Sequence, residues 1–557
     1  MPGSGSQPPG DEEPGLLGRF PVLGIVLAVV LGVGAIVAVI LAVTSGDGDG
    51  DDGDPGPPVA VTGGTMRVAA VGLASLDPLD ARDPNAVMVV DQIFDGLVAY
   101  DPETLDPVPA LAASWEANPE QTVFTFRLAE GARFHDGTPV TSADVKFTLE
   151  RVARKGSQSP LLAQLEPVVG FVGYNVAGTD PGLAGLETPD PATLVVRLDR
   201  PLATFPSVLG HPGFGIVPKA TVEAAGDGFK TAPVGSGPFR LEAADEARLR
   251  LLRFAEHLRP AKLDGIDLVR FADVDAAYLA FTGGDIDLAP VPPASVDQAA
   301  ERYGRHGMGP YIGLVFYAMN LKSPDLADTR LRQAISLAID RERIVREVYK
   351  DTVELASGLV ADGVPGRVPN ACGERCGHDV ERAKALVAEA FPQGGVPEVA
   401  IDHDDDPANP TQAAVAASIK ADLDAVGIPS VLRPTPFADY GQFLVSGQQE
   451  LFRLGWIADY PSADGFLTPL FLSTSPENLT GLASPEVDDG LKAARSEPDS
   501  RARELKYQEV EQKVLDQFVV IPLAQLEIRL VVGERVRSFS LTPLGTFDGA
   551  AVTLAVP

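Results

Sequence analysis

The sequence predicts a mixed α/β protein with several lobes, preceded by a single N-terminal transmembrane helix. Its 557 residues are too many for one ordinary hydrophobic core and enough for two or three lobes. Strand-like and helix-like segments follow one another without a regular βα repeat, which favours several separately packed units. Residues 20–43 form an uninterrupted run of apolar residues and Gly, with one Pro near its start.

This apolar run is long enough to cross a bilayer. As a helix it would extend roughly 36 Å at ~1.5 Å per residue. A cleaved signal peptide would have a shorter apolar region and a more basic start, whereas Arg19 is the only nearby cation. We therefore expect residues 20–44 to be an uncleaved anchor, with a cytoplasmic tail at 1–19. The acidic residues after the run, beginning with Asp47, indicate that the body of the protein lies outside the cell.

A tract rich in Gly, Asp and Pro separates the predicted anchor from the folded body. Such a composition cannot build a core, and we expect residues 45–62 to act as a solvated spacer. The alternating Asp residues look like a calcium-binding loop at first sight. However, Asp52 stands where an EF-hand needs Gly, and Pro58 stands where it needs Glu, so calcium binding is not predicted.

Charge and motif content exclude several classes of function. The chain has 45 Lys and Arg residues against 77 Asp and Glu residues, and a formal net charge of −32. This charge would repel phosphate backbones, so no nucleic-acid partner is expected. The sequence contains no Gly-x-Ser-x-Gly elbow, no His-Glu-x-x-His motif and no convincing nucleophile beside a base. We therefore expect neither an enzyme nor a cofactor.

The two cysteines, Cys372 and Cys376, lie outside the predicted membrane segment. In that compartment we expect them to form a small disulfide that holds a loop. A metal site is not predicted, because His378 alone does not complete a zinc-binding set. The run of His and Asp at 403–406 is interpreted as a solvated turn.

Hydrophobic periodicity and turn residues predict the strands and helices of the folded body. Thr141 and Asp144, three positions apart, suit a capping box ahead of a helix whose apolar positions begin at Val145. The other predicted helices are at 89–97, 329–338, 415–426 and 507–518. The predicted strands are at 65–71, 122–128, 193–198, 249–254, 266–271, 316–320, 428–432, 451–456, 519–523 and 528–532.

The most informative segment is 132–151, in which the turn-forming residues 135–139 precede the capped helix. We interpret His135 and Asp136 as structural, because hydrogen bonds from their side chains to the nearby backbone account for both. The segment resembles a signature of the family 5 extracytoplasmic solute-binding proteins of ABC importers, a group that includes dipeptide and oligopeptide receptors. Further segments resemble the same family in the expected order, at 92–97, 233–239, 320–341 and 454–461.

The resemblance implies a two-lobed α/β fold like that of class II periplasmic binding proteins, with an extra inserted domain. The two lobes would close over a ligand by hinge motion. Lobe I would take residues 63–84, 213–316 and 518–557, the inserted domain 85–212, and lobe III 317–517.

The resemblance also implies a ligand site around Asp459. In the peptide-binding branches, the matching Asp pairs with the ligand's α-amino group, which neutralises a carboxylate that closure would bury. The backbone of Gly455 and Ile457 would pair with an extended ligand as though it were an added strand. Trp456 would line a side-chain pocket or belong to the core. Arg453 would face a ligand carboxylate or join a structural ion pair.

The expected function is that of a single-pass receptor in the cell membrane, with an extracytoplasmic body that binds short peptides or related amines. It would act as a monomer with the permease and ATPase subunits of an ABC importer. Residues 461–465 replace the usual Asp-Pro-Asp-Asn run, which leaves nickel chelates, sugars or opines as alternative ligands. A sensor without a transport role is another alternative, because no lipid-bearing Cys follows the apolar run.

Overall fold

The computed structural model describes residues 60–407 and 409–555. The predicted tail at 1–19, the anchor at 20–44 and most of the spacer at 45–62 lie outside these residues. Within the described ranges, no helix is both long enough and apolar enough to cross a membrane.

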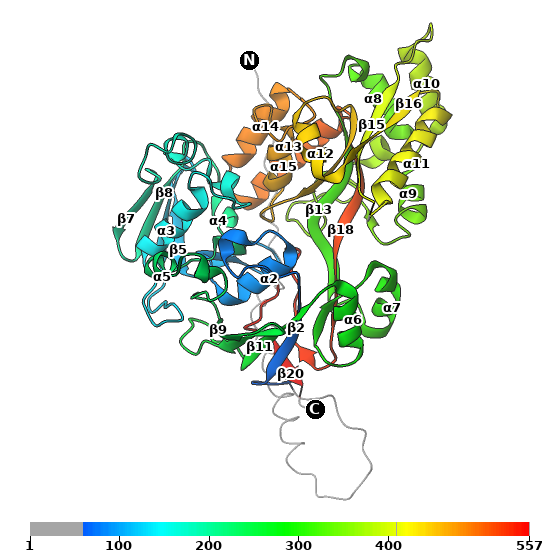
Figure 1. Ribbon diagram of the computed structural model, residues 1–557. Helices are drawn as coiled ribbons and strands as arrows, with labels where there is room; N and C mark the ends of the chain where they lie inside the picture. The colour runs from blue at the N-terminus through cyan, green and yellow to red at the C-terminus, as the bar shows by residue number, and fades with distance from the viewer. Residues whose placement is uncertain (1–59, 408, 556–557) are drawn as a thin grey trace, which may run out of the picture. The chain divides into compact units, whose positions relative to one another are not determined.

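A large mixed sheet runs through the described body of the protein (Figure 1). Its strands are joined in the order β16-β15-β17-β13-β18-β12-β2-β11-β10-β9. Four of them form one end: β16 (Ser430–Pro436), β15 (Val399–Asp405), β17 (Leu451–Ile457) and the C-terminal part of β13 (Met308–Met319), at residues 313–319. The other end consists of β12 (Leu288–Pro290), β2 (Thr65–Val71), β11 (Gly265–Phe271), β10 (Arg248–Arg253) and β9 (Phe239–Ala244).

Two long antiparallel strands, β13 and β18 (Val520–Val532), connect the two ends of this sheet. The end of β18, at residues 530–532, pairs with β12, and residues 313–319 of β13 pair with β17. Their mutual register shifts between Pro310 and Leu314 and again between Val315 and Phe316. Such irregularities bend a strand pair locally. The predicted boundaries at 316/317 and 517/518 fall within or just before these strands, and the full set of domain limits stays a prediction.

The region of the predicted insertion contains its own antiparallel sheet, in the order β5-β6-β8-β7. The strands are β5 (Ala112–Ala117), β6 (Val123–Leu128), β8 (Thr193–Arg197) and β7 (Leu186–Asp190). Helix α3 (Ser142–Ala153) packs against β7 and β8. Its first turn has the predicted capping box, in which the Thr141 N–H and hydroxyl both donate to the Asp144 carboxylate.

Separate hydrophobic clusters support the different parts of the body. One cluster lies under β2, β9 and β11 and includes Val68 and Phe239. Another fills the region of the small sheet and includes Phe124 and Phe126. The end of the sheet around β15 and β17 also includes residues 313–319 of β13 and 520–525 of β18. Hydrophobic clusters cover both of its faces. The prediction of several packed units, made from chain length, agrees with these clusters.

Three of the segments that resemble the family, at 92–97, 132–151 and 233–239, contact one another in the fold. The His135 N–H donates to the Gly235 carbonyl at 2.8 Å, and its ring accepts from the Gly235 N–H and contacts the Gly237 carbonyl. Gly237 also donates to the Ile93 carbonyl at 2.9 Å. A Cβ added to Gly235 would lie 2.0 Å from that same oxygen, so only glycine permits the approach. A structural role for His135 fits this arrangement, but the expected hydrogen bonds to the nearby backbone are wrong, because its partners Gly235 and Gly237 lie 100 and 102 positions away in the sequence.

Helices cover the end of the sheet around β15. They are α8 (Thr329–Ala338), α9 (Arg341–Glu347), α10 (Val380–Ala390), α11 (Thr411–Ala425) and α12 (Phe437–Val445). The helix predicted at 89–97 is α2 (Pro84–Ile93), which begins earlier because the Asp83 side chain caps it ahead of Pro84. The late helix, α15 (Ser500–Leu515), also begins before the predicted 507.

The interpretation of residues 403–406 as a solvated turn is wrong. His403 and Asp404 lie in β15 and are buried, and so is the preceding Asp402. Arg433 from β16 donates to the Asp402 carboxylate, which explains how this strand carries a buried acid. Paired charges of this kind can enter a core that would exclude a lone carboxylate.

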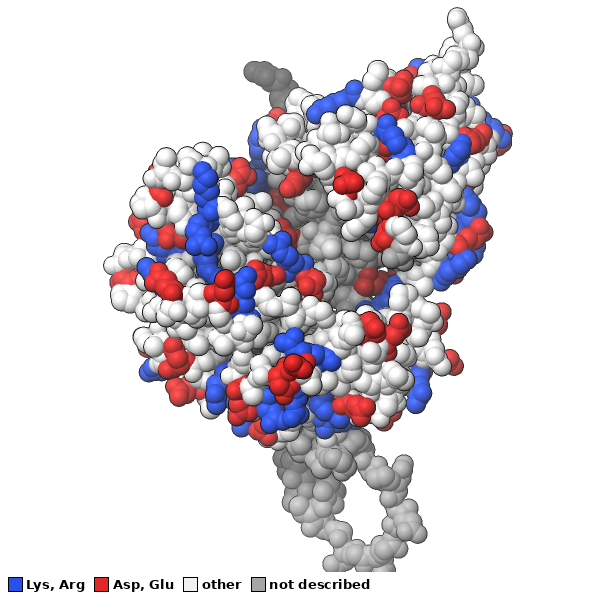
Figure 2. Space-filling model, viewed as in Figure 1, with Lys and Arg blue, Asp and Glu red and all other residues white. Residues whose placement is uncertain are grey.

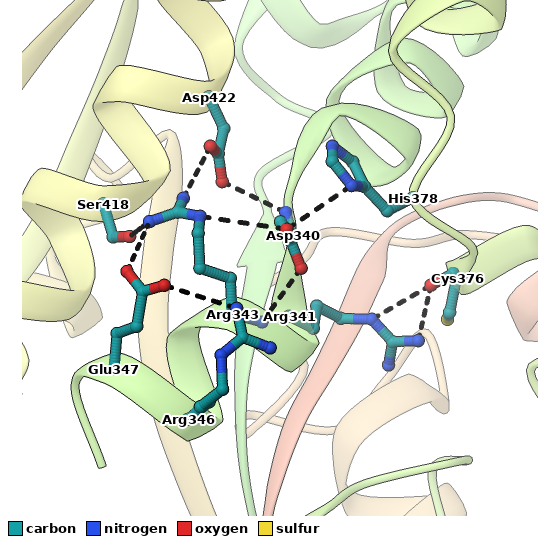
Figure 3. Close-up of polar contacts among 9 residues, drawn as sticks. All are labelled: Asp340, Arg341, Arg343, Arg346, Glu347, Cys376, His378, Ser418 and Asp422. Atoms are coloured by element: carbon teal, nitrogen blue, oxygen red, sulfur yellow. Dashed lines mark hydrogen bonds and ion pairs between the residues drawn. The ribbon is translucent and has the colours of Figure 1, made fainter. Parts of the chain in front are cut away.

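Cys372 and Cys376 form a disulfide, with their Cα atoms 5.7 Å apart. Figure 3 shows the buried Arg341 side chain directed at the Cys376 carbonyl, to which its Nε donates at 3.1 Å. Nδ1 of His378 lies 3.5 Å from the carboxylate of Asp340 (Figure 3). No group of three or more His, Cys, Asp or Glu side chains in the described ranges could hold a metal ion.

Candidate ligand-binding site

Strand β17 presents a free edge over its last residues. It pairs with β13 from Leu451 to Ile457, but its pairing with β15 covers only Leu451 and Phe452 within the described chain. The Ala458 N–H donates to the Ile312 carbonyl of β13. Successive residues of a strand direct their N–H and C=O groups to opposite sides, so those of Gly455 and Ile457 point away from β13. Gly455 and Ile457 therefore direct backbone donors and acceptors towards open space.

Asp459 follows this edge and lines a cavity of about 150 Å³. The cavity is built from parts of the chain that are far apart in sequence. Its lining includes Arg82 and Pro84, Leu161 and His211, Tyr311 and Ile312, and Ile457. The strand edge and this cavity are therefore continuous, because Ile457 belongs to both.

The environment of Asp459 opposes its charge. Burial raises the pKa of the carboxyl to about 6, against a lowering effect of the hydrogen bond from Gln164 Nε2, which is 2.6 Å long. The Glu477 carboxylate raises the pKa further by repulsion. Burial and the nearby Asp459 also raise the pKa of Tyr311 to about 12. A cation in this cavity would relieve the unfavourable burial of the Asp459 charge.

His211 adds a polar group to the same cavity. Its Nδ1 accepts a hydrogen bond of 2.9 Å from the Gly213 N–H, and burial lowers the pKa of the ring to about 4. The imidazole is therefore neutral near pH 7, and an occupied Nδ1 places its proton on Nε2. His211 can present an N–H donor beside the Asp459 acceptor.

A second cavity, of about 400 Å³, is also lined by Ile457. It is lined by Arg453, Gly455, Trp456 and Ile457 from β17. The remaining lining residues are Val315, Tyr440, Gly441, Leu444, Leu454 and Leu526. The Trp456 indole donates to the Gly465 carbonyl at 2.7 Å, which fixes the ring as a wall of this space. The structure thus brings the five predicted ligand-binding residues together around two adjoining cavities.

Arg453 forms the ion pair that the sequence left open as an alternative. Its Nη1 lies 3.5 Å from Oδ1 of Asp404, and the Asp404 side chain is only 6% exposed. The Tyr440 hydroxyl holds the strand from the same side, by donating to the Arg453 carbonyl at 2.8 Å. The guanidinium therefore has a counterion within the protein.

Sequence reasoning did not identify Gln164, His211 or Tyr311 as members of the site. Gln164 and His211 come from the region of the inserted domain, and Tyr311 comes from β13. No local motif links them to Asp459, since the nearest of them is well over a hundred residues away in sequence. The adjacent His211 and Pro212, at the start of a short 3₁₀ turn, were the only local signal available.

Comparison with known proteins identifies the family of this chain. Residues 106–478 match the model of the bacterial extracellular solute-binding proteins, family 5 Middle. The chain belongs to this family. The sequence-based expectation of a family 5 solute-binding protein with a two-lobed α/β fold is confirmed.

The similarity to known proteins extends over most of this chain and most of theirs. The periplasmic murein peptide-binding protein MppA of Escherichia coli K12 is 27% identical over 81% of this chain and 86% of its own. The glutathione-binding protein GsiB of the same strain is 26% identical, over 86% and 92% respectively. The solved structure of clavulanic acid biosynthesis oligopeptide binding protein 2 superposes with a TM-score of 0.79 at 25% identity, covering 90% of this chain and 97% of that one.

Proposed function

We propose that this protein is a membrane-anchored receptor of an ABC importer that binds short peptides or related amine-bearing ligands. The observation that carries the proposal is Asp459, a partly buried carboxylate in a cavity next to a free strand edge. A ligand ammonium would neutralise this charge in the cavity and form a charge-assisted hydrogen bond with it. Peptide-binding relatives such as MppA and GsiB support this class of ligand.

The rest of an extended ligand would pair with the free edge of β17. The backbone groups of Gly455 and Ile457 would supply hydrogen bonds that do not depend on the ligand's side chains. Trp456 and Arg453 would line the space for one of those side chains. His211 would donate from its Nε2 to an acceptor near the ligand's amino end. Binding of this kind favours a backbone with a free amine over any single side-chain sequence.

The N-terminal segment would keep the receptor at the membrane. The composition of residues 20–44 supports an uncleaved transmembrane anchor, and the acidic spacer at 45–62 would separate it from the binding body. The permease and ATPase subunits of an importer would be its partners, and one copy of the chain would suffice to enclose a ligand between the lobes. No catalytic step is part of this proposal.

The test is to identify what the protein binds. The full chain, purified in mild detergent, would be analysed by native mass spectrometry for small molecules that remain bound, and then titrated with a mixed pool of short peptides. We expect bound species with a free amino group and a peptide-like backbone. Failure to bind any member of the pool would contradict the proposal, as would a retained ligand without an amine.

A further inference from the structure

The larger cavity beside Trp456 has a lining that selects for uncharged groups. Strands β13, β17 and β18 contribute Val315, Leu454 and Leu526 to its lining, and helix α12 contributes Tyr440 and Leu444. Apart from Arg453, the lining carries no charged side chain among the described residues. Its volume of about 400 Å³ falls in the range of pockets that enclose organic groups.

The one charge in this lining is already compensated. Asp404 approaches Arg453 from β15 and is almost completely buried, with its Oδ1 3.5 Å from Nη1 of Arg453. In the described part of the chain, Asp404 Oδ1 accepts no hydrogen bond, so Arg453 is the cation that offsets its charge. If a ligand carboxylate took Arg453 for itself, Asp404 would be left buried and unpaired, which is strongly unfavourable.

We propose that this cavity is a specificity pocket for an uncharged, apolar or aromatic ligand side chain, and that Asp404 excludes acidic groups by neutralising Arg453. This inference rests on the proposed function, because the occupant is a side chain of the ligand held along β17. Ile457 lies two residues before Asp459, which corresponds to about 7 Å of extended chain. The side chain that enters the cavity therefore belongs to the second or third residue of a peptide whose amine is at Asp459.

The inference can be tested with peptides that differ in one side chain. The full chain in detergent would be titrated calorimetrically with Ala-X-Ala and Ala-Ala-X, in which X is Ala, Leu, Phe, Glu or Lys. At one of the two positions, we expect Leu or Phe to bind at least about tenfold more tightly than Glu. Equal or tighter binding of the Glu peptides at both positions would overturn the inference while leaving the proposed function standing.

Two variants separate the roles of volume and charge. Gly441 is in a helix and a Cβ added there meets no atom within 4 Å, so Gly441→Leu can fill the cavity without backbone strain. It should weaken Leu and Phe peptides at least tenfold and spare Ala peptides, whereas Val445→Leu, at an exposed position of the same helix, should spare both. Asp404→Asn should shift the preference at least tenfold towards Glu.

An equal effect of Gly441→Leu on all peptides would overturn the pocket even if Asp404→Asn does not fold. If none of the peptides binds to the unaltered protein, the proposed function fails and the pocket loses its occupant with it.

Discussion

Gln164 Nε2 donates a hydrogen bond of 2.6 Å to Asp459 Oδ2, although the two residues are 295 positions apart in the sequence. The amide belongs to the region of the inserted domain and the carboxylate to the loop after β17. The contact orients Asp459 towards the cavity that it shares with His211 and Tyr311. Among the described residues, no other hydrogen bond holds the Asp459 carboxylate, so its second oxygen is available to a ligand.

Replacing Gln164 should change the acidity of the site. The hydrogen bond lowers the pKa of Asp459, against the larger effect of burial. In Gln164→Ala, the carboxyl would lose this donor, and its pKa in the ligand-free protein should rise above about 6. The pH at which peptide binding weakens should move upwards accordingly, as measured by calorimetric titration between pH 5 and pH 8. An unchanged pH midpoint would contradict the contact.

The affinity for amine-bearing ligands should depend on pH with a defined sign. The ligand ammonium needs an ionised Asp459, whose pKa in the free protein is about 6. Affinity should therefore be full above that pH and fall as the pH drops through it, by about tenfold between pH 7 and pH 5. The ligand amine stays largely charged over this range. Asp459→Asn provides the control, because its affinity should not change with pH in this window.

The buried Asp464 should be a point of high sensitivity for stability. Its carboxylate accepts hydrogen bonds from the Tyr460 and Tyr507 hydroxyls, each 2.7 Å long, and lies 3.7 Å from Nε of Arg495. Removing one partner of a buried ionic network costs about 3–5 kcal/mol. We expect Asp464→Ala to lower the free energy of unfolding by that amount in urea denaturation. A loss below about 1 kcal/mol would show that this network does not hold the fold.

Figure 2 shows Lys and Arg side chains interspersed with Asp and Glu over the visible face. In a surface pair such as Arg197 and Glu187, both side chains are roughly half exposed. Such an ion pair contributes little to the free energy of unfolding. The exposed pair Arg197 and Glu187 is thus a matched control for Asp464: Glu187→Ala should change stability by less than about 1 kcal/mol.

The disulfide between Cys372 and Cys376 closes a very short loop. The chain-entropy model gives about 2 kcal/mol of stabilisation for a loop of this size. We expect the double variant Cys372→Ser and Cys376→Ser to lose about that much unfolding free energy. Adding a reductant should destabilise the original protein to a similar extent and leave the variant unaffected. Free thiols on the folded, unreduced protein, detected by alkylation and mass spectrometry, would contradict the pairing.

The sequence predicted local features better than distant contacts. The capping box at Thr141 and Asp144 follows from two residues three positions apart, so it could be predicted without tertiary structure. The burial of Asp404 could not, because its partner Arg453 lies on another strand and polar runs usually indicate turns. Likewise, Gln164 and His211 reach Asp459 only through packing between distant segments, which leaves no periodic pattern in the sequence.

The most direct test of the account is the effect of Asp459→Asn on ligands with and without a free amine. Asn keeps the size of the side chain and removes its charge. For a peptide with a free amino terminus, calorimetry should show a loss of about 2–5 kcal/mol in binding free energy, whereas the N-acetylated form of that peptide should bind both proteins equally weakly. Equal binding of the free-amine peptide to both proteins would contradict the central claim that Asp459 holds the ligand's ammonium.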